Sequence, residues 1–91
     1  MNYIKVIWHH DFSDDPVELY CELDDGRMEV RKVEIFRDQS VGFASATETN
    51  GLTQLGYLQV PPNDEIAADP EFEVEEIDQS QFEQVWKSAT D

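Results

Sequence analysis

The strict alternation of residues 17–24 is the sequence feature that most constrains the fold. Apolar and polar side chains take turns along it, in the order Val17, Glu18, Leu19, Tyr20, Cys21, Glu22, Leu23, Asp24. Because successive side chains of a β-strand point to opposite faces, this pattern predicts a strand with one buried face. The dipeptide Asp25-Gly26 that follows supplies the positive φ of a tight reversal, and it therefore predicts an antiparallel hairpin.

Three further segments have the composition of strands. Residues 3–9 are rich in β-branched and aromatic types, and residues 41–46 carry small residues that permit close packing. Residues 28–37 change apolar parity between Val30 and Val33, so we expect a bulge near Arg31-Lys32. Hairpin connections between these strands predict a meander. The weakly patterned residues 52–60 are either a short edge strand or an irregular return.

The last third of the chain combines helix signals with alternation. Residues 63–68 fit a short helix with Asn63 as its cap, and residues 71–76 alternate apolar side chains with carboxylates. Asp78 and Gln81 have the spacing of a capping box, which predicts a helix over 79–88. The sequence thus predicts a single α+β domain over residues 1–91, an antiparallel β-meander of four or five strands with a C-terminal α-helix packed on one face.

Charge excludes several classes of partner. The 91 residues contain 21 Asp and Glu against 6 Lys and Arg, a net charge of −15. Binding to nucleic acid depends on many cationic contacts with phosphates, and an anionic membrane surface repels such a chain, so we expect neither as a partner. The single cysteine has no internal disulfide partner, and no apolar run approaches the length of a membrane span. These features favour the cytoplasm.

Catalytic signals are weak. His9 and His10 precede Asp11, Asp14 and Asp15, and imidazole with carboxylate suits several divalent ions. Adjacent strand residues point to opposite faces, however, so the two rings converge only where the strand has ended. Cys21 shares a face with apolar residues and is expected in the core. We therefore predict a binding protein rather than an enzyme, with no cofactor and no metal, and keep a small metal-dependent hydrolase using His9 and His10 as the alternative.

The most unusual feature is a run of eight acids within fifteen residues that contains no Lys or Arg. We call it the acidic stretch; its members are Asp64, Glu65, Asp69, Glu71, Glu73, Glu75, Glu76 and Asp78. A solvated face kept for solubility explains it without a partner. Capture of a basic protein by fast, electrostatically steered association explains it as well. On the second interpretation the loop residues Asp11, Phe12, Asp14 and Asp15, together with Tyr20, form a further contact.

Several segments together resemble a family of small acidic bacterial proteins without an assigned activity. They are Tyr3-Ile-Lys-Val-Ile-Trp8, Pro16-Val-Glu-Leu-Tyr20, Glu22-Leu-Asp24, Glu29-Val-Arg-Lys-Val-Glu34 and Ile66-Ala-Ala-Asp-Pro-Glu-Phe72. In size and charge such proteins resemble the immunity proteins of contact-dependent or polymorphic toxin systems. The resemblance implies an antitoxin-like role, in which the chain binds and neutralises a cognate basic toxin. A nuclease domain is the first candidate for that toxin. A non-catalytic adaptor that binds by strand addition stays open as another alternative.

Overall fold

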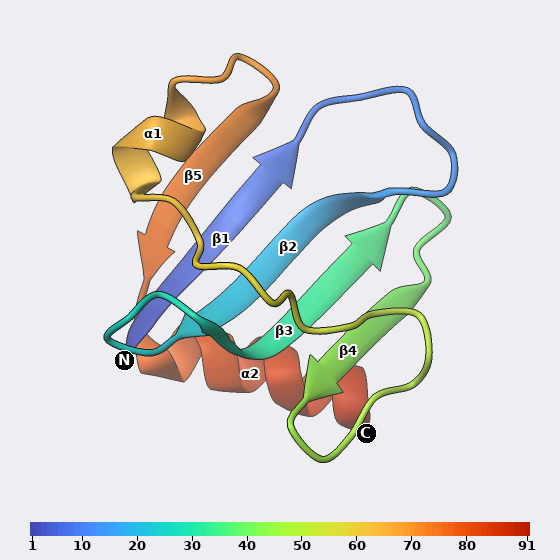
Figure 1. The fold of residues 1–91 in the computed structure, drawn as a ribbon. Helices are drawn as coiled ribbons and strands as arrows, with labels where there is room; N and C mark the ends of the chain where they lie inside the picture. The colour runs from blue at the N-terminus through green and yellow to red at the C-terminus, as the bar shows by residue number, and fades with distance from the viewer.

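The computed structural model describes residues 1–91 as one five-stranded antiparallel sheet with two helices (Figure 1). The elements follow the order β1 (Asn2–Trp8), β2 (Pro16–Leu23), β3 (Glu29–Phe36), β4 (Val41–Ser45), α1 (Asn63–Ala67), β5 (Phe72–Ile77) and α2 (Gln79–Thr90). The predicted α+β class, with a C-terminal helix on the sheet, is confirmed. No helix in the structure is long and apolar enough to cross a membrane.

The fifth strand does not continue the meander. The strand order is β4-β3-β2-β1-β5, so the first four strands are neighbours in sequence, whereas β5 returns to pair with β1. Residues 52–60 form no strand and belong to the irregular connection that carries the chain from β4 to α1. This connection crosses the front of the sheet, and α2 lies behind it (Figure 1).

Both faces of the sheet are therefore covered, each by a different part of the chain. On the front face, β1 and β2 contribute the core cluster Ile4, Val6, Cys21 and Leu23, against which the half-buried Leu19, Val60, Ile66, Phe72 and Val74 pack. On the back face, Phe82 of α2 is completely buried, and its ring centroid lies 5.5 Å from that of Tyr3. Trp86 of α2 meets Phe43 of β4 edge to face at 5.6 Å.

A bulge in β3 accounts for its change of parity. Leu23 pairs with Glu29 and Glu22 with Arg31, so Val30 is an extra residue without a partner on β2. The expected bulge near Arg31-Lys32 is thus present one residue earlier. Since one extra residue exchanges the faces of all that follow, it turns Val33 toward α2, where it is fully buried.

The predicted cap residue is confirmed for α2 and is wrong for α1. Asp78 caps α2 as predicted: its side chain accepts from Gln81 N at 2.8 Å, and its backbone N donates to Gln81 Oε1 at 2.9 Å. The expected cap of α1 is wrong, because Asn63 is already helical and Pro62 holds the cap position. The Asn63 side chain instead accepts from Arg27 Nη2 at 2.9 Å.

The reversal between β2 and β3 places positive φ one residue later than expected. Gly26 does not have it; Arg27 does, with φ of 61°. This costs Arg27 some backbone strain. The same conformation lets its guanidinium bind the carbonyls of Val60 at 3.0 Å and Pro61 at 2.7 Å. Arg27 therefore fixes the end of the front connection to the hairpin.

Candidate functional site

The acidic stretch runs down one side of the molecule. Asp64 and Glu65 lie in the first turn of α1, Asp69 and Glu71 lie in the turn that follows, and the last four members extend along β5 to the cap of α2. All eight side chains belong to exposed residues. Since β5 is the last strand on its side of the sheet, no further strand of this chain covers the carboxylates.

Three members of the stretch have structural partners. Asp78 caps α2, Asp69 Oδ1 accepts from Glu71 N at 2.9 Å, and Glu73 Oε2 lies 2.5 Å from His9 Nε2. The other five form no side-chain hydrogen bond or ion pair within the chain; they are Asp64, Glu65, Glu71, Glu75 and Glu76.

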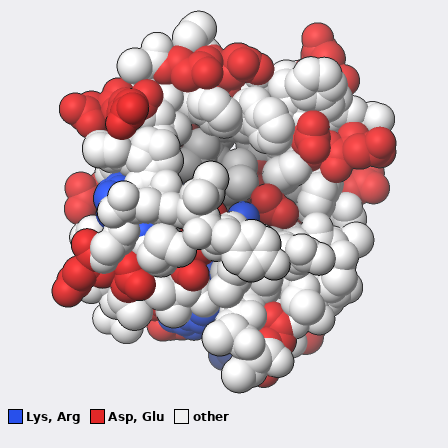
Figure 2. Space-filling model, in the orientation of Figure 1, with Lys and Arg blue, Asp and Glu red and all other residues white.

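Five of the six cations of the chain bind groups outside the acidic stretch, and the sixth, Lys87, lies in the last turn of α2. Lys5 pairs with Glu18 at 3.6 Å, Lys32 with Glu29 at 2.9 Å, and Arg31 with Glu22 and Glu83. Arg27 and Arg37 bind backbone carbonyls. No Lys or Arg therefore forms an ion pair with a member of the acidic stretch, although Lys5 is the cross-strand partner of Glu75. Figure 2 shows the front face of the molecule, where Asp and Glu gather around the rim and little Lys or Arg surface is visible.

Of the four cations among residues 27–37, only Arg31 forms an ion pair across neighbouring strands. Arg31 and Glu22 are partners across β3 and β2, whereas the Lys32–Glu29 pair lies within one strand. Arg27 and Arg37 form no ion pair. Their guanidinium groups hold loops by binding backbone oxygen atoms, and Arg37 Nη2 binds the carbonyl of His10.

His9 and His10 turn to different partners. His9 contacts Glu73 of β5, whereas both ring nitrogens of His10 bind its own loop. Nδ1 of His10 accepts from Phe12 N at 2.9 Å, so Nε2 carries the proton that it donates to Pro16 O at 2.7 Å. Metal binding at His10 would break one of these bonds, and no group of three or more His, Cys, Asp and Glu side chains in the structure could hold a metal ion.

The loop 11–15 lies at the same end of the sheet as the turn between α1 and β5 (Figure 1). His9 N donates to Glu71 O at 2.7 Å across the two segments. Asp11, Phe12 and Asp14 are exposed and Asp15 is half-buried; Phe12 itself is 60% exposed and stacks on the His10 ring at 5.5 Å. The structure therefore brings this loop beside the part of the acidic stretch that contains Asp69 and Glu71.

Tyr20 does not join that rim. It is half-buried on the back face, where its hydroxyl donates to Glu18 at 3.5 Å and Lys5 Nζ lies 5.7 Å from its ring. Burial raises the pKa of the Tyr20 hydroxyl above its ordinary value. Tyr20 is thus half-buried rather than exposed, and Lys5 lies between it and Glu75 of the acidic stretch, because Lys5 pairs with both residues.

Cys21 lies in the front core, where it is 4% exposed. Burial raises the pKa of its thiol to about 12. A thiol held protonated in this way is a poor nucleophile, so the geometry supports the expected packing role.

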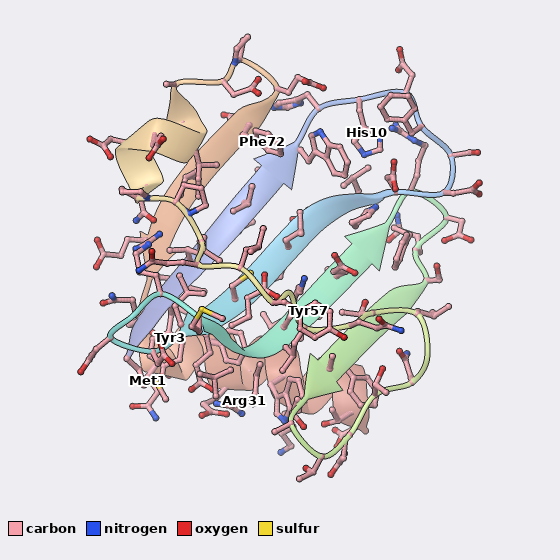
Figure 3. The ribbon with its side chains drawn as sticks, viewed as in Figure 1. Met1, Tyr3, His10, Arg31, Tyr57 and Phe72 are labelled. Atoms are coloured by element: carbon pink, nitrogen blue, oxygen red, sulfur yellow. The ribbon has the colours of Figure 1, made fainter.

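Two surface features escaped the sequence patterns. One is a groove between α1 and β5 lined by Pro61, Glu65, Ile66, Asp69 and Phe72. The other is the front connection, residues 46–62, where Tyr57 is 90% and Leu58 82% exposed. Figure 3 shows Tyr57 in front of the sheet. Neither has a periodic signal, because irregular backbone has no fixed alternation of faces.

The fold and its surface define a small acidic α+β domain, with a helix on one face of an antiparallel sheet and an acidic stretch that forms no ion pair with Lys or Arg. Residues 2–91 match the model of the family described as Domain of unknown function (DUF6881), and the chain belongs to that family. Comparison with curated proteins and with solved structures found no match to either.

Proposed function

We propose that this protein is an immunity-type inhibitor that binds and neutralises a basic toxin domain in the cytoplasm. A nuclease domain is the first candidate for this partner. One observation carries the proposal: the acidic stretch forms an exposed side of the molecule with which no Lys or Arg of the chain forms an ion pair. A nuclease needs a cationic cleft to hold phosphates. An acidic surface of this extent attracts such a cleft from a distance and occupies it in place of nucleic acid.

The cost of the arrangement supports a role beyond packing. Unpaired like charges on α1 and β5 repel one another and lower the free energy of unfolding. A basic partner removes that repulsion when it binds. The loop 11–15 extends the same rim and adds Phe12, an exposed aromatic side chain of the kind that often dominates binding energy.

The first experiment is a pull-down of the tagged protein from its own cells, with the product of the gene immediately upstream co-expressed and bound proteins identified by mass spectrometry. The proposal expects a stoichiometric basic partner whose expression alone is lethal and whose toxicity this protein relieves. Absence of any partner, combined with a zinc- or manganese-induced rise in Tm, would favour the hydrolase alternative at His9 and His10.

Matched charge variants then test the surface. Glu71→Gln/Glu75→Gln/Glu76→Gln removes three charges from the acidic stretch, and Asp25→Asn/Glu48→Gln/Asp91→Asn removes three elsewhere. None of these six side chains has a hydrogen-bond partner within the chain. We expect the first variant to raise the Kd for the partner at least tenfold and to flatten its salt dependence, and the second to have a much smaller effect. Equal effects would mean that net charge alone matters.

An adaptor that binds by strand addition has one observation in its favour. His9 N donates to Glu71 O, and with the register of β1 and β5 this means that the backbone N–H and C=O groups of Val74 and Glu76 point away from β1. They lie on the outer edge of the sheet, where a strand of a partner could pair with them. The opposite edge at β4 is closed by Asn50, whose side chain binds Phe43 N and Val41 O. A complex insensitive to salt would favour this alternative.

A further inference from the structure

A groove of about 310 Å³ lies between α1 and the start of β5. Half-buried Ile66 and Phe72, which also pack against the front core, form its floor, and the exposed Pro61 lines it beside them. Glu65 and Asp69 line it as well, and both are exposed. The groove thus combines an apolar floor with two carboxylates at the solvent side.

The backbone around the groove is held in place by short-range hydrogen bonds. Asp69 N donates to Ile66 O at 3.1 Å, and Phe72 N donates to Asp69 O at 3.0 Å. The Phe72 ring stacks on Trp8 of β1, with centroids 5.7 Å apart and planes inclined by 28°. A ligand that fits therefore finds the groove already formed, which lowers the entropy cost of binding.

No cation of the chain balances the two carboxylates. Asp69 uses Oδ1 to accept from Glu71 N, and its second oxygen has no partner within the chain. Arg27 lies close to Pro61 but directs its donors to the carbonyls of Val60 and Pro61 and to Asn63. Charge complementarity therefore calls for a cationic occupant.

The molecule contains one internal arginine site in which an aromatic surface and two carboxylates hold the guanidinium. The guanidinium carbon of Arg31 lies 5.0 Å from the Phe82 ring centroid and 5.1 Å from that of Trp86, while its nitrogens bind the carboxylates of Glu22 and Glu83. Figure 3 shows Arg31 and Phe72 at opposite ends of the sheet, so the two places are separate. The groove likewise combines an aromatic side chain, Phe72, with two carboxylates, those of Glu65 and Asp69.

We infer that the groove binds an arginine side chain of a basic protein partner. Arginine fits better than lysine because its planar guanidinium is weakly hydrated and stacks on aromatic and apolar surfaces, whereas an ammonium group keeps its water. Its stem covers Pro61 and Ile66, and its head group reaches Glu65 and Asp69. The inference rests on the proposed function for the nature of the partner, but the binding of arginine itself does not depend on it.

The test is a titration of the full-length protein with N-acetyl-arginine methylamide, followed by NMR of isoleucine methyl and phenylalanine ring signals. We expect saturable shifts at Ile66 and Phe72 with a Kd on the order of millimolar, as suits one side chain. The citrulline analogue has the same shape without the charge, and the lysine analogue has charge without the plane. Both are expected to bind at least fivefold more weakly.

Two variants with equal loss of charge complete the test. Glu65→Gln/Asp69→Asn keeps an acceptor for Glu71 N and is expected to raise the Kd for the arginine probe at least tenfold. Glu75→Gln/Glu76→Gln, outside the groove, is expected to change it less than twofold. Equal binding of the citrulline analogue, or equal loss in both variants, would overturn the inference.

The result separates this inference from the proposed function. Saturable arginine binding without any captured partner would overturn the proposed function alone. A captured basic partner, together with no saturable shift at Ile66 and Phe72 on titration with the arginine probe, would overturn the inference alone.

Discussion

Arg31 and Glu22 face each other across β3 and β2 and form two hydrogen bonds, Nε to Oε1 at 2.6 Å and Nη2 to Oε2 at 2.9 Å. The same guanidinium binds Glu83 of α2 at 2.9 and 2.8 Å. Glu22 is only 5% exposed. A single arginine therefore satisfies a buried carboxylate and joins the helix to the back of the sheet.

Replacing Arg31 by methionine is expected to lower the free energy of unfolding by about 3–5 kcal/mol, because it leaves the Glu22 carboxylate buried without a counter-charge. Glu83→Gln should cost no more than about 1 kcal/mol, since the Glu83 side chain is 43% exposed. Urea unfolding followed by Trp fluorescence measures both. The control is Glu22→Gln/Arg31→Met, which removes the buried charge and should recover part of the loss; an unchanged midpoint in Arg31→Met would contradict this account.

Acid should weaken this network. Hydrogen bonds from Arg31 lower the pKa of Glu22 and of Glu83 below the ordinary value of about 4.3. A lowered pKa in the folded state gives stability that is present above the unfolded value and lost as pH falls through the folded value. The difference in unfolding free energy between the wild type and Glu22→Gln/Glu83→Gln should therefore shrink between pH 6 and pH 3. Relief of repulsion among the other acids affects both proteins alike, and a constant difference would refute the assignment.

The thiol of Cys21 should be almost inert in the folded protein. With burial raising its pKa to about 12, its thiolate fraction at pH 8 is about a thousandfold below that of an ordinary thiol. Reaction with Ellman's reagent is expected to be slower than in urea by at least that factor, since burial also blocks access. Rapid labelling under native conditions would place Cys21 outside the core.

Gly42 is expected to tolerate no side chain. A Cβ atom there would lie 2.1 Å from Thr53 Oγ1. Thr53 cannot move aside easily, because it is 2% exposed and donates to Glu34 at 2.7 Å. Gly42→Ala should thus lower the free energy of unfolding by about 1–3 kcal/mol. Gly26→Ala is the control, with its nearest contact at 3.4 Å, and should stay within about 0.5 kcal/mol of wild type; equal losses would show that clash with Thr53 is not the cause.

Local patterns predicted most of the elements. The alternation in 17–24 and the pair Asp78 and Gln81 both depend on neighbours in sequence, and the structure confirms the strand and the helix cap. The expectation of a single buried face is wrong for this strand, because α2 covers its polar side and leaves Glu22 only 5% exposed. The positive φ at Arg27 and the helical Asn63 were not predicted. In each case the unexpected backbone conformation accompanies a hydrogen bond between the Arg27 side chain and residues more than thirty positions away. Such a bond cannot be predicted from the neighbouring residues in the sequence.

The candidate site divides in the same way. The sequence by itself determined the number and order of the carboxylates and the absence of Lys and Arg among residues 64–78. Only the tertiary structure decided that β5 returns to β1, which places those carboxylates at an open edge beside the loop 11–15 and forms the groove against α1. The physical reason is that charge is a property of each residue, whereas an edge or a groove exists only once distant segments pack to exclude water between them.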